Sequence, residues 1–273
     1  MSIQARFTFM GTGGSMGTPV IGCHCAVCHS LNPLDQRMRP SGLLQIADKN
    51  FVIDVGPDFR MQALRLKIEK VDGVLISHVH SDHIAGLDDL RAYYFLHKSK
   101  TPCLLSKPTF EKLKQRYPYL FQPTDNKKSV TAQLDFCVLP QEFGSIFFQG
   151  IQWTFFSYLH AGIQVTGFRV GNFAYVSDIR YYSNQVIDML TGVEILTLSV
   201  HKKKATKVHF GIEEAIEFST LIKAKKTYFT HLSHEFEHGK IQFPPGFELA
   251  YDGMIIFFAI PKKDLYDDRP NST

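Results

Sequence analysis

The residues best suited to metal chemistry stand in one short run, Ser77-His78-Val79-His80-Ser81-Asp82-His83. Three imidazoles and one carboxylate fall within six positions of it. These are the ligand types that hold Zn²⁺, Mn²⁺ or Fe²⁺ in proteins. The alternative is a polar loop whose histidines cluster by chance, which is improbable because the chain has only twelve. We therefore predict a metal centre that uses His78, His80, Asp82 and His83.

The elements around this run would hold its side chains in place. Residues 73–77 form an apolar, strand-like segment, and residues 84–96 show a helical pattern. A loop between a strand and a helix lets several side chains converge while the backbone stays fixed. The run is therefore predicted to lie in a strand-to-helix loop.

Strand-like and helical patterns alternate along the rest of the chain. Strands are predicted at residues 7–10, 43–47, 51–55, 194–199 and 227–230, and helices at 58–66, 182–190 and 212–223. Residues 134–176 are nearly all strand-like. Two α/β stretches that flank a β-rich middle predict two packed sheets with helices outside. No repeat or linker divides the chain, so we expect one domain over residues 1–273.

The pattern His78-x-His80-x-Asp82-His83 resembles the signature of the metallo-β-lactamase superfamily. This resemblance implies an α+β fold, a four-layer αββα sandwich with metals at one edge. It also implies three further ligands downstream, and the chain offers His160, Asp178 and His231 in that order, each at the end of a strand-like run. Singly, each is as well explained by a hydrogen-bonded structural role. After the first motif, together they predict a dinuclear centre.

The resemblance also implies how the ligands are shared between two divalent ions, Zn or Mn. One ion would take His78, His80 and His160. The other would take Asp82, His83 and His231. Asp178 would bridge the two.

A second candidate metal site is the run Cys23-His24-Cys25-Ala26-Val27-Cys28. Three thiolates at this spacing can wrap one tetrahedral Zn²⁺, and the fourth ligand could be His24 or His29. The alternative is three buried thiols without metal. The chain resembles the PhnP-type phosphoribosyl cyclic phosphodiesterase subgroup, in which such a structural zinc uses three Cys and a His that matches His234. Thiolates favour a reducing compartment.

The resemblance to this subgroup spans nearly the whole chain. It is carried by Gly11-Thr12-Gly13-Gly14-Ser15, Arg39-Pro40-Ser41, Asp54-Val55-Gly56-Pro57-Asp58, Gly86-Leu87-Asp88-Asp89-Leu90-Arg91, Pro245-Gly246-Phe247 and Tyr251-Asp252-Gly253. Within these segments, Asp54 and Asp88 could accept hydrogen bonds from ligand imidazoles. They could equally be turn or capping residues.

Catalysis is assigned to Asp82 and His209. Two ions about 3.5–4 Å apart can share a hydroxide and neutralise charge on a phosphoryl oxygen. His209 matches the family position beside the substrate phosphate, where it could donate a proton or hold a phosphate oxygen. Its alternative role is to cap the helix that follows. The neighbouring basic run, His201-Lys202-Lys203-Lys204 with Lys207, is either a solvated loop or an attractor of anions, and it departs from the subgroup's Arg- and Pro-containing segment.

Composition narrows the choice of partners. A net charge of +4 is too small to indicate nucleic-acid binding by itself. No basic region with a long apolar stretch opens the sequence, and the apolar run 254–260 is far shorter than the roughly 20 residues that span a bilayer. We expect a cytoplasmic protein without membrane contact. A homodimer is left open.

These observations predict a hydrolase that cleaves a small, possibly cyclic, phosphate diester. One alternative is a nuclease that trims the 3' end of transfer-RNA precursors, although no Gly- and Lys-rich insertion of that family is visible. Others are a role like that of the pyrroloquinoline-quinone biosynthesis protein, and a non-catalytic zinc-binding protein of the same fold. The complete ligand set argues against the last. A β-lactamase is disfavoured because nothing marks secretion.

Overall fold

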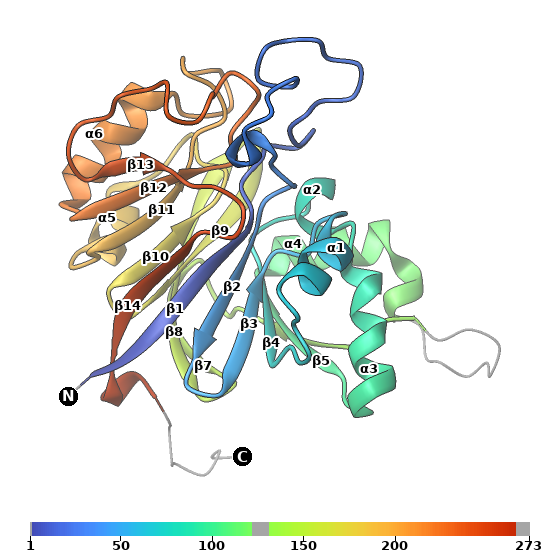
Figure 1. The fold of residues 1–273 in the computed structure, drawn as a ribbon. Helices are drawn as coiled ribbons and strands as arrows, with labels where there is room; N and C mark the ends of the chain where they lie inside the picture. Colours follow the sequence, from blue (N-terminus) through green and yellow to red (C-terminus); the bar gives the residue numbers. More distant parts are fainter. Residues whose placement is uncertain (1, 122–130, 266–273) are drawn as a thin grey trace.

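Two β-sheets pack face to face with helices on both outer sides in a computed structural model of the chain (Figure 1). The structure describes residues 2–121 and 131–265. Each sheet has seven strands. In each sheet, an antiparallel half continues into a parallel half. This arrangement is the predicted α+β, four-layer αββα sandwich.

The first sheet has the strand order β14-β1-β2-β3-β4-β5-β6. Its strands are β1 (Ser2–Gly11), β2 (Ser41–Ile46), β3 (Lys49–Ile53), β4 (Gly73–Ile76), β5 (Thr101–Leu105), β6 (Leu134–Val138) and β14 (Ile255–Pro261). The helices of this half are α1 (Phe59–Arg65), α2 (Ser81–Ile84), α3 (Arg91–His97) and α4 (Lys107–Arg116), with short 3-10 turns at Pro33–Asp35, Leu87–Leu90 and Pro118–Phe121.

The second sheet has the order β13-β12-β11-β10-β9-β8-β7. Its strands are β7 (Phe143–Phe148), β8 (Ile151–His160), β9 (Ile163–Val170), β10 (Phe173–Val176), β11 (Ile195–Ser199), β12 (Lys226–Thr230) and β13 (Phe247–Leu249). Helices α5 (Asn184–Leu190) and α6 (Ile212–Ile222) cover its outer face, and a 3-10 turn at Lys262–Asp264 follows β14.

Three hydrophobic clusters fill the three interfaces between the layers. Phe7, Phe51 and Trp153 belong to the cluster between the sheets. A second cluster joins the outer face of one sheet to α5 and α6, and a third joins the other sheet to α1, α3 and α4. Strand β4 is covered on both faces: Leu75 belongs to the cluster between the sheets, and Val74 and Ile76 belong to the cluster beneath the helices. A strand covered on both faces is continuously apolar.

Two local expectations need correction. The predicted helix over residues 84–96 is broken into the end of α2, a 3-10 turn and α3. The break lies at Gly86, where an added Cβ would be 2.1 Å from the carbonyl oxygen of Gly56. Strand β5 and helix α4 were not predicted. Pro102 weakens the strand signal of β5, and α4 buries only Thr109 and Leu113, so its apolar periodicity is slight.

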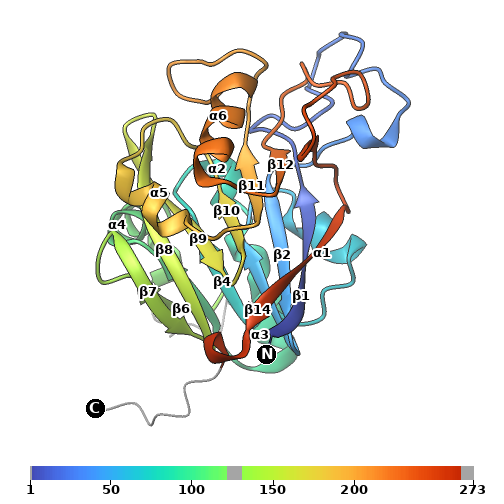
Figure 2. The same cartoon turned by 90° about the vertical axis from the view of Figure 1, so that its left-hand side faces the viewer.

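The elements bring several polar chain segments to one end of the molecule. Strands β4, β10, β11 and β12 all end there, and the carboxyl ends of parallel strands are where ligand sites form. The loop between β1 and β2 lies beside the segment that follows β12 (Figures 1 and 2), and Gly14 N donates to the carbonyl of Leu232. Among the residues that the structure describes, no helix has the length and apolar character needed to cross a membrane.

Candidate metal centre

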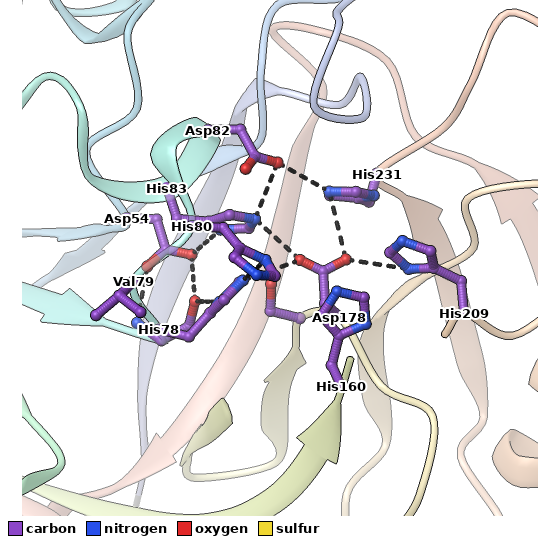
Figure 3. Close-up of polar contacts among 12 residues, drawn as sticks. Asp54, His78, Val79, His80, Asp82, His83, His160, Asp178, His209 and His231 are labelled. Carbon is purple, nitrogen blue, oxygen red and sulfur yellow. Dashed lines mark hydrogen bonds and ion pairs between the residues drawn. The ribbon is translucent and has the colours of Figure 1, made fainter. Parts of the chain in front are cut away.

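The loop after β4 carries the predicted run into the interior. His78 and His83 are fully buried, and Asp82 is nearly so. An added Cβ on Gly56 would lie 2.1 Å from the carbonyl oxygen of Asp82, so the absence of a side chain there lets the two loops touch. This contact holds the loop in place, and its side chains point toward one cluster (Figure 3).

Asp178, two residues beyond β10, lies at the middle of this cluster (Figure 3). Its Oδ2 is 2.9 Å from His83 Nε2 and 3.5 Å from His78 Nε2. Its Oδ1 is 3.3 Å from His231 Nε2 and 3.4 Å from His209 Nδ1. The two oxygens of one carboxylate therefore face two different sets of imidazoles.

The ligand set predicted for one ion comes together as expected. Asp82 Oδ2 is 3.3 Å from both His83 Nε2 and His231 Nε2. The ligands predicted for the other ion, His78, His80 and His160, do not all lie as close together. His78 Nε2 and His80 Nδ1 are 3.0 Å apart, whereas the ring of His160 is centred 5.3 Å from that of His80. A donor atom of His160 instead groups with Asp178 and His209. The division of ligands between two ions stays a prediction.

These residues fit a bound cation. His83 Nε2 and Asp178 Oδ1 are buried and have no hydrogen-bond partner within residues 2–121 and 131–265. Buried polar atoms in this state destabilise a fold unless something else satisfies them. In addition, two imidazole nitrogens of His78 and His80 face each other at the short separation already given. Divalent cations bound by nitrogen and carboxylate oxygen would satisfy all of these atoms.

Burial and charge set the protonation of the cluster. Burial lowers the pKa of His78 and of His80. At His83 burial acts the same way, but Asp82 and Asp54 outweigh it and raise the pKa. Burial would raise the pKa of Asp178, yet His231 and His83 hold it well below its usual range. The carboxylate therefore stays ionised, which is the form that binds metal.

A second layer of hydrogen bonds orients the rings. His83 Nδ1 donates to Asp54 Oδ2 at 2.7 Å, and Asp54 also accepts from the backbone N–H and hydroxyl of Ser77. His160 Nδ1 donates to the carbonyl of Val208 at 2.7 Å. Each bond places the hydrogen on Nδ1 and leaves Nε2 free for the centre. Asp88 has no such role, because it accepts from Ala132 N and pairs with Arg91.

His209 faces the centre and does not cap α6. The N-cap of that helix is Gly211, and the ring of His209 lies 4.4 Å from that of His160, centre to centre. The backbone N–H of His209 donates to Thr206 Oγ1, which steadies the turn before the helix. Burial lowers the pKa of His209 to about 3, so the ring is neutral near pH 7.

His201 is a residue of the site that sequence reasoning missed. It was assigned to a basic loop, but its ring packs 4.8 Å from that of His209 and 5.3 Å from that of His231, centre to centre. Burial and then His231 lower its pKa. One signal could have found it: His201 follows the end of β11, as Asp178 and His231 follow β10 and β12. Lys202, next in the run, pairs with Glu235 at 3.6 Å.

The thiolate residues also come together. His234 Nδ1 lies 3.2 Å from Cys23 Sγ, 3.5 Å from Cys25 Sγ and 3.4 Å from Cys28 Sγ. The backbone N–H of Cys28 lowers the pKa of Cys25 to about 6, whereas burial raises that of Cys28 to about 11. These three sulfurs and one ring nitrogen lie close enough together to hold one metal ion. An S₃N set of this kind suits a closed, tetrahedral zinc site.

The local alternatives for the fourth ligand, His24 and His29, contact each other instead, with ring nitrogens 3.3 Å apart. His234 stands three residues after His231, so an ion held by the thiolates would tie the loop between β1 and β2 to a ligand of the other centre.

Comparison with known proteins agrees with this geometry. A family model described as a beta-lactamase superfamily domain matches residues 49–232. The chain therefore belongs to this superfamily. Within the superfamily it resembles the PhnP family. The crystal structure of a diphosphatase from that family is 35% identical, with a TM-score of 0.87 over 95% of this chain and 99% of that one.

Two curated relatives have names that describe other activities. An octanoyltransferase from Porphyromonas gingivalis is 32% identical over 260 residues, 91% of this chain and 51% of that protein. The chain thus spans about half the length of this relative. A ribonuclease Z from Bacteroides fragilis is 36% identical over 66 residues, 23% of this chain and 22% of that protein.

The hydrogen bond between Asp54 and His83 gives a first test. Asp54→Asn removes the negative charge but keeps a residue type that tolerates the positive φ of 60° found there. Loss of such a partner weakens metal binding by about 10–100-fold, and we expect this in a chelator-competition titration. Asp88→Asn is the matched control and should bind metal like wild type. Equal affinities of the two variants would contradict the role of Asp54.

The thiolate site gives a second test. In Cys25→Ser, metal analysis should show one zinc fewer per chain, and the melting temperature should fall by roughly 5–10 °C because a ligand of the folded state is lost. Cys137→Ser, at a partly buried cysteine outside the cluster, is the control. A Cys25→Ser protein with full zinc content and an unchanged melting temperature would rule out the structural zinc.

Proposed function

We propose that the chain is a phosphodiesterase that hydrolyses a small, possibly cyclic, phosphate diester with two divalent ions, Zn or Mn, at the centre around Asp178. The observation that carries this proposal is the place of the buried Asp178 carboxylate, which lies beside His78 of one predicted ligand set and beside His83 and His231 of the other. A carboxylate that faces two ligand sets is suited to bridge two ions. The metal ligands would be His78, His80, Asp82, His83, His160, Asp178 and His231. A structural zinc would be held by Cys23, Cys25, Cys28 and His234.

When bound, two such ions supply a nucleophile from water and positive charge for the phosphoryl oxygens. The chain's own residues then have separate tasks. Asp54 and the carbonyl of Val208 keep the rings of His83 and His160 turned toward the centre. Asp82 stays ionised because His83 and His231 outweigh the effect of burial on its pKa. The ionised carboxylate of Asp82 is therefore available to bind the ion that His231 would also hold.

His209 is the proposed residue that meets the leaving group. Its Nδ1 is turned toward Asp178 Oδ1, so Nε2 is the atom available to a substrate. Because Nδ1 faces a carboxylate, the neutral ring carries its hydrogen there, so Nε2 must first take up a proton before it can pass one to the leaving oxygen. The charge of Asp178 favours the ring that carries both protons. His209 is not needed in either predicted ligand set, which makes it separable from metal binding by mutation.

Phosphate substrates are favoured over acyl substrates by the similarity to a diphosphatase of the PhnP family along nearly the whole chain. The match to ribonuclease Z is confined to 66 residues, so cleavage of transfer-RNA precursors is the second candidate. The octanoyltransferase is about twice as long as this chain, so its activity does not carry over to the part that matches.

Purified protein loaded with Zn²⁺ or Mn²⁺ should be assayed on cyclic phosphates, linear diesters, diphosphate esters, thioesters and precursor transfer RNA. Exclusive turnover of thioesters or RNA would overturn the proposal.

The role of His209 can be separated from that of the metals. His209→Ala should keep the wild-type metal content while turnover falls by about 10²–10⁴, the usual effect of losing a positioned acid or base. The loss should be smaller for a nitrophenolate leaving group, which departs without a proton. His97→Ala, on the outer helix α3, is the control. Wild-type rates on both substrate types would leave His209 without a catalytic role.

A further inference from the structure

Two of the three cysteines of the thiolate group stand in a C-x-x-C pattern, Cys25-Ala26-Val27-Cys28. The segment forms a single helical turn, in which His29 N donates to the carbonyl of Cys25. Residues three apart in such a turn lie on the same face. Cys28 N donates to Cys25 Sγ at 3.4 Å, and the donor atoms of the whole group lie within 4.8 Å of one another. The two sulfurs are therefore close enough for a disulfide to form with little movement of the backbone.

The two thiols differ in their access to solvent. Cys25 is partly exposed, whereas Cys28 is buried, with 6% of its surface exposed. Cys25 Sγ accepts the N–H of Cys28, and Cys28 Sγ accepts the N–H of Val20 at 3.3 Å. A soluble oxidant reaches the exposed thiol first, and a neighbouring thiol can then react with the product. The pair is thus arranged as one thiol that is attacked and one that resolves.

The same pair helps to hold the loop between β1 and β2 in place. His234 Nδ1 faces all three sulfurs, so an ion bound there would use both Cys25 and Cys28. A metal ligand must be a thiolate, and the sulfurs of a disulfide carry no such charge. Once the pair is joined, only Cys23 and His234 remain as ligands, which is too few for a closed zinc site. The oxidised loop would lose this tie to the segment that carries His231.

We propose that Cys25 and Cys28 form a redox-sensitive pair, in which a hydroperoxide joins their sulfurs and removes two ligands from the predicted structural zinc site. The sulfur of Cys25 attacks one oxygen of the hydroperoxide, the O–O bond breaks, and water or an alcohol leaves. The sulfur of Cys28 then attacks the sulfenic acid, displaces water and forms the disulfide. Counted from two thiols, both hydrogens leave in these products, and the O–O bond takes up the two electrons that the sulfurs lose. A thiol reductant reverses the change.

The test exposes purified, zinc-loaded protein to hydrogen peroxide and follows zinc and thiols, so it does not depend on which ester the centre cleaves. Compared with an untreated sample, wild type should release one zinc per chain to a colorimetric chelator and lose two of its five thiols. Peptide mapping should find a Cys25–Cys28 disulfide, and a thiol reductant with added zinc should restore the starting state. The oxidised protein should melt roughly 5–10 °C lower. Cys137→Ser, outside the cluster, is the control and should respond like wild type.

A second variant separates the two steps. In Cys28→Ser the resolving thiol is missing, so peroxide should leave a sulfenic acid on Cys25 that dimedone labels, whereas wild type should label weakly. Equal labelling of the two proteins would contradict the role of Cys28.

Three results with wild type would overturn the inference. They are retention of zinc and of all thiols after peroxide, a disulfide between another pair of cysteines, and conversion of Cys25 to a sulfinic acid, which a thiol reductant does not reverse. Thiol counting and peptide mapping do not require bound zinc. They therefore test the pair even if the structural zinc assignment fails.

Discussion

Burial of the Asp178 carboxylate is the constraint on which this end of the molecule depends. Its side chain is 1% exposed and ionised, a state that strongly destabilises a protein interior unless positive charge surrounds it. The surrounding groups come from three separate segments of the chain: His78 and His83 from the loop after β4, His209 from the loop before α6, and His231 from the end of β12. These imidazoles supply only part of the positive charge that the carboxylate needs, and bound cations would supply the rest.

The sandwich is organised so that these contributions meet. Strands β4, β10, β11 and β12 end at the same side, and His78, Asp178, His201 and His231 follow them there. Some residues at this end adopt strained backbone conformations. Asp54 and His231 both have a φ of 60°, in the left-handed region, which costs on the order of 1–3 kcal/mol for such residues. The apolar clusters between the layers and the thiolate group beside His231 hold this geometry in place.

Much of this could be predicted from the sequence because the signals are local. The run from His78 to His83 is short, and Asp178 and His231 directly follow apolar strands whose direction fixes where they end. The layer order followed from the alternation of strands and helices. Asp54 was recognised as one of two candidate partners of an imidazole, but its choice over Asp88 depends on the packing of β3 against β4.

The features that could not be predicted depend on contacts between distant segments. His201 stands in a run of lysines, and only the packing of Gly14 and β12 against it turns its ring into the site. The helix predicted after His83 is broken because Gly86 touches Gly56, far earlier in the chain. No residue pattern reports such approaches. The partition of ligands between two ions is of the same kind, since it depends on the placement of His160.

Anomalous diffraction from crystals grown with Mn²⁺ tests the central claim most directly, because it locates the ions without reference to turnover. The account predicts two manganese peaks about 3.5–4 Å apart, one on each side of the Asp178 carboxylate, with an oxygen of Asp178 bound to each. A single peak that leaves one oxygen of Asp178 without metal, or two ions that share a different bridge, would contradict it.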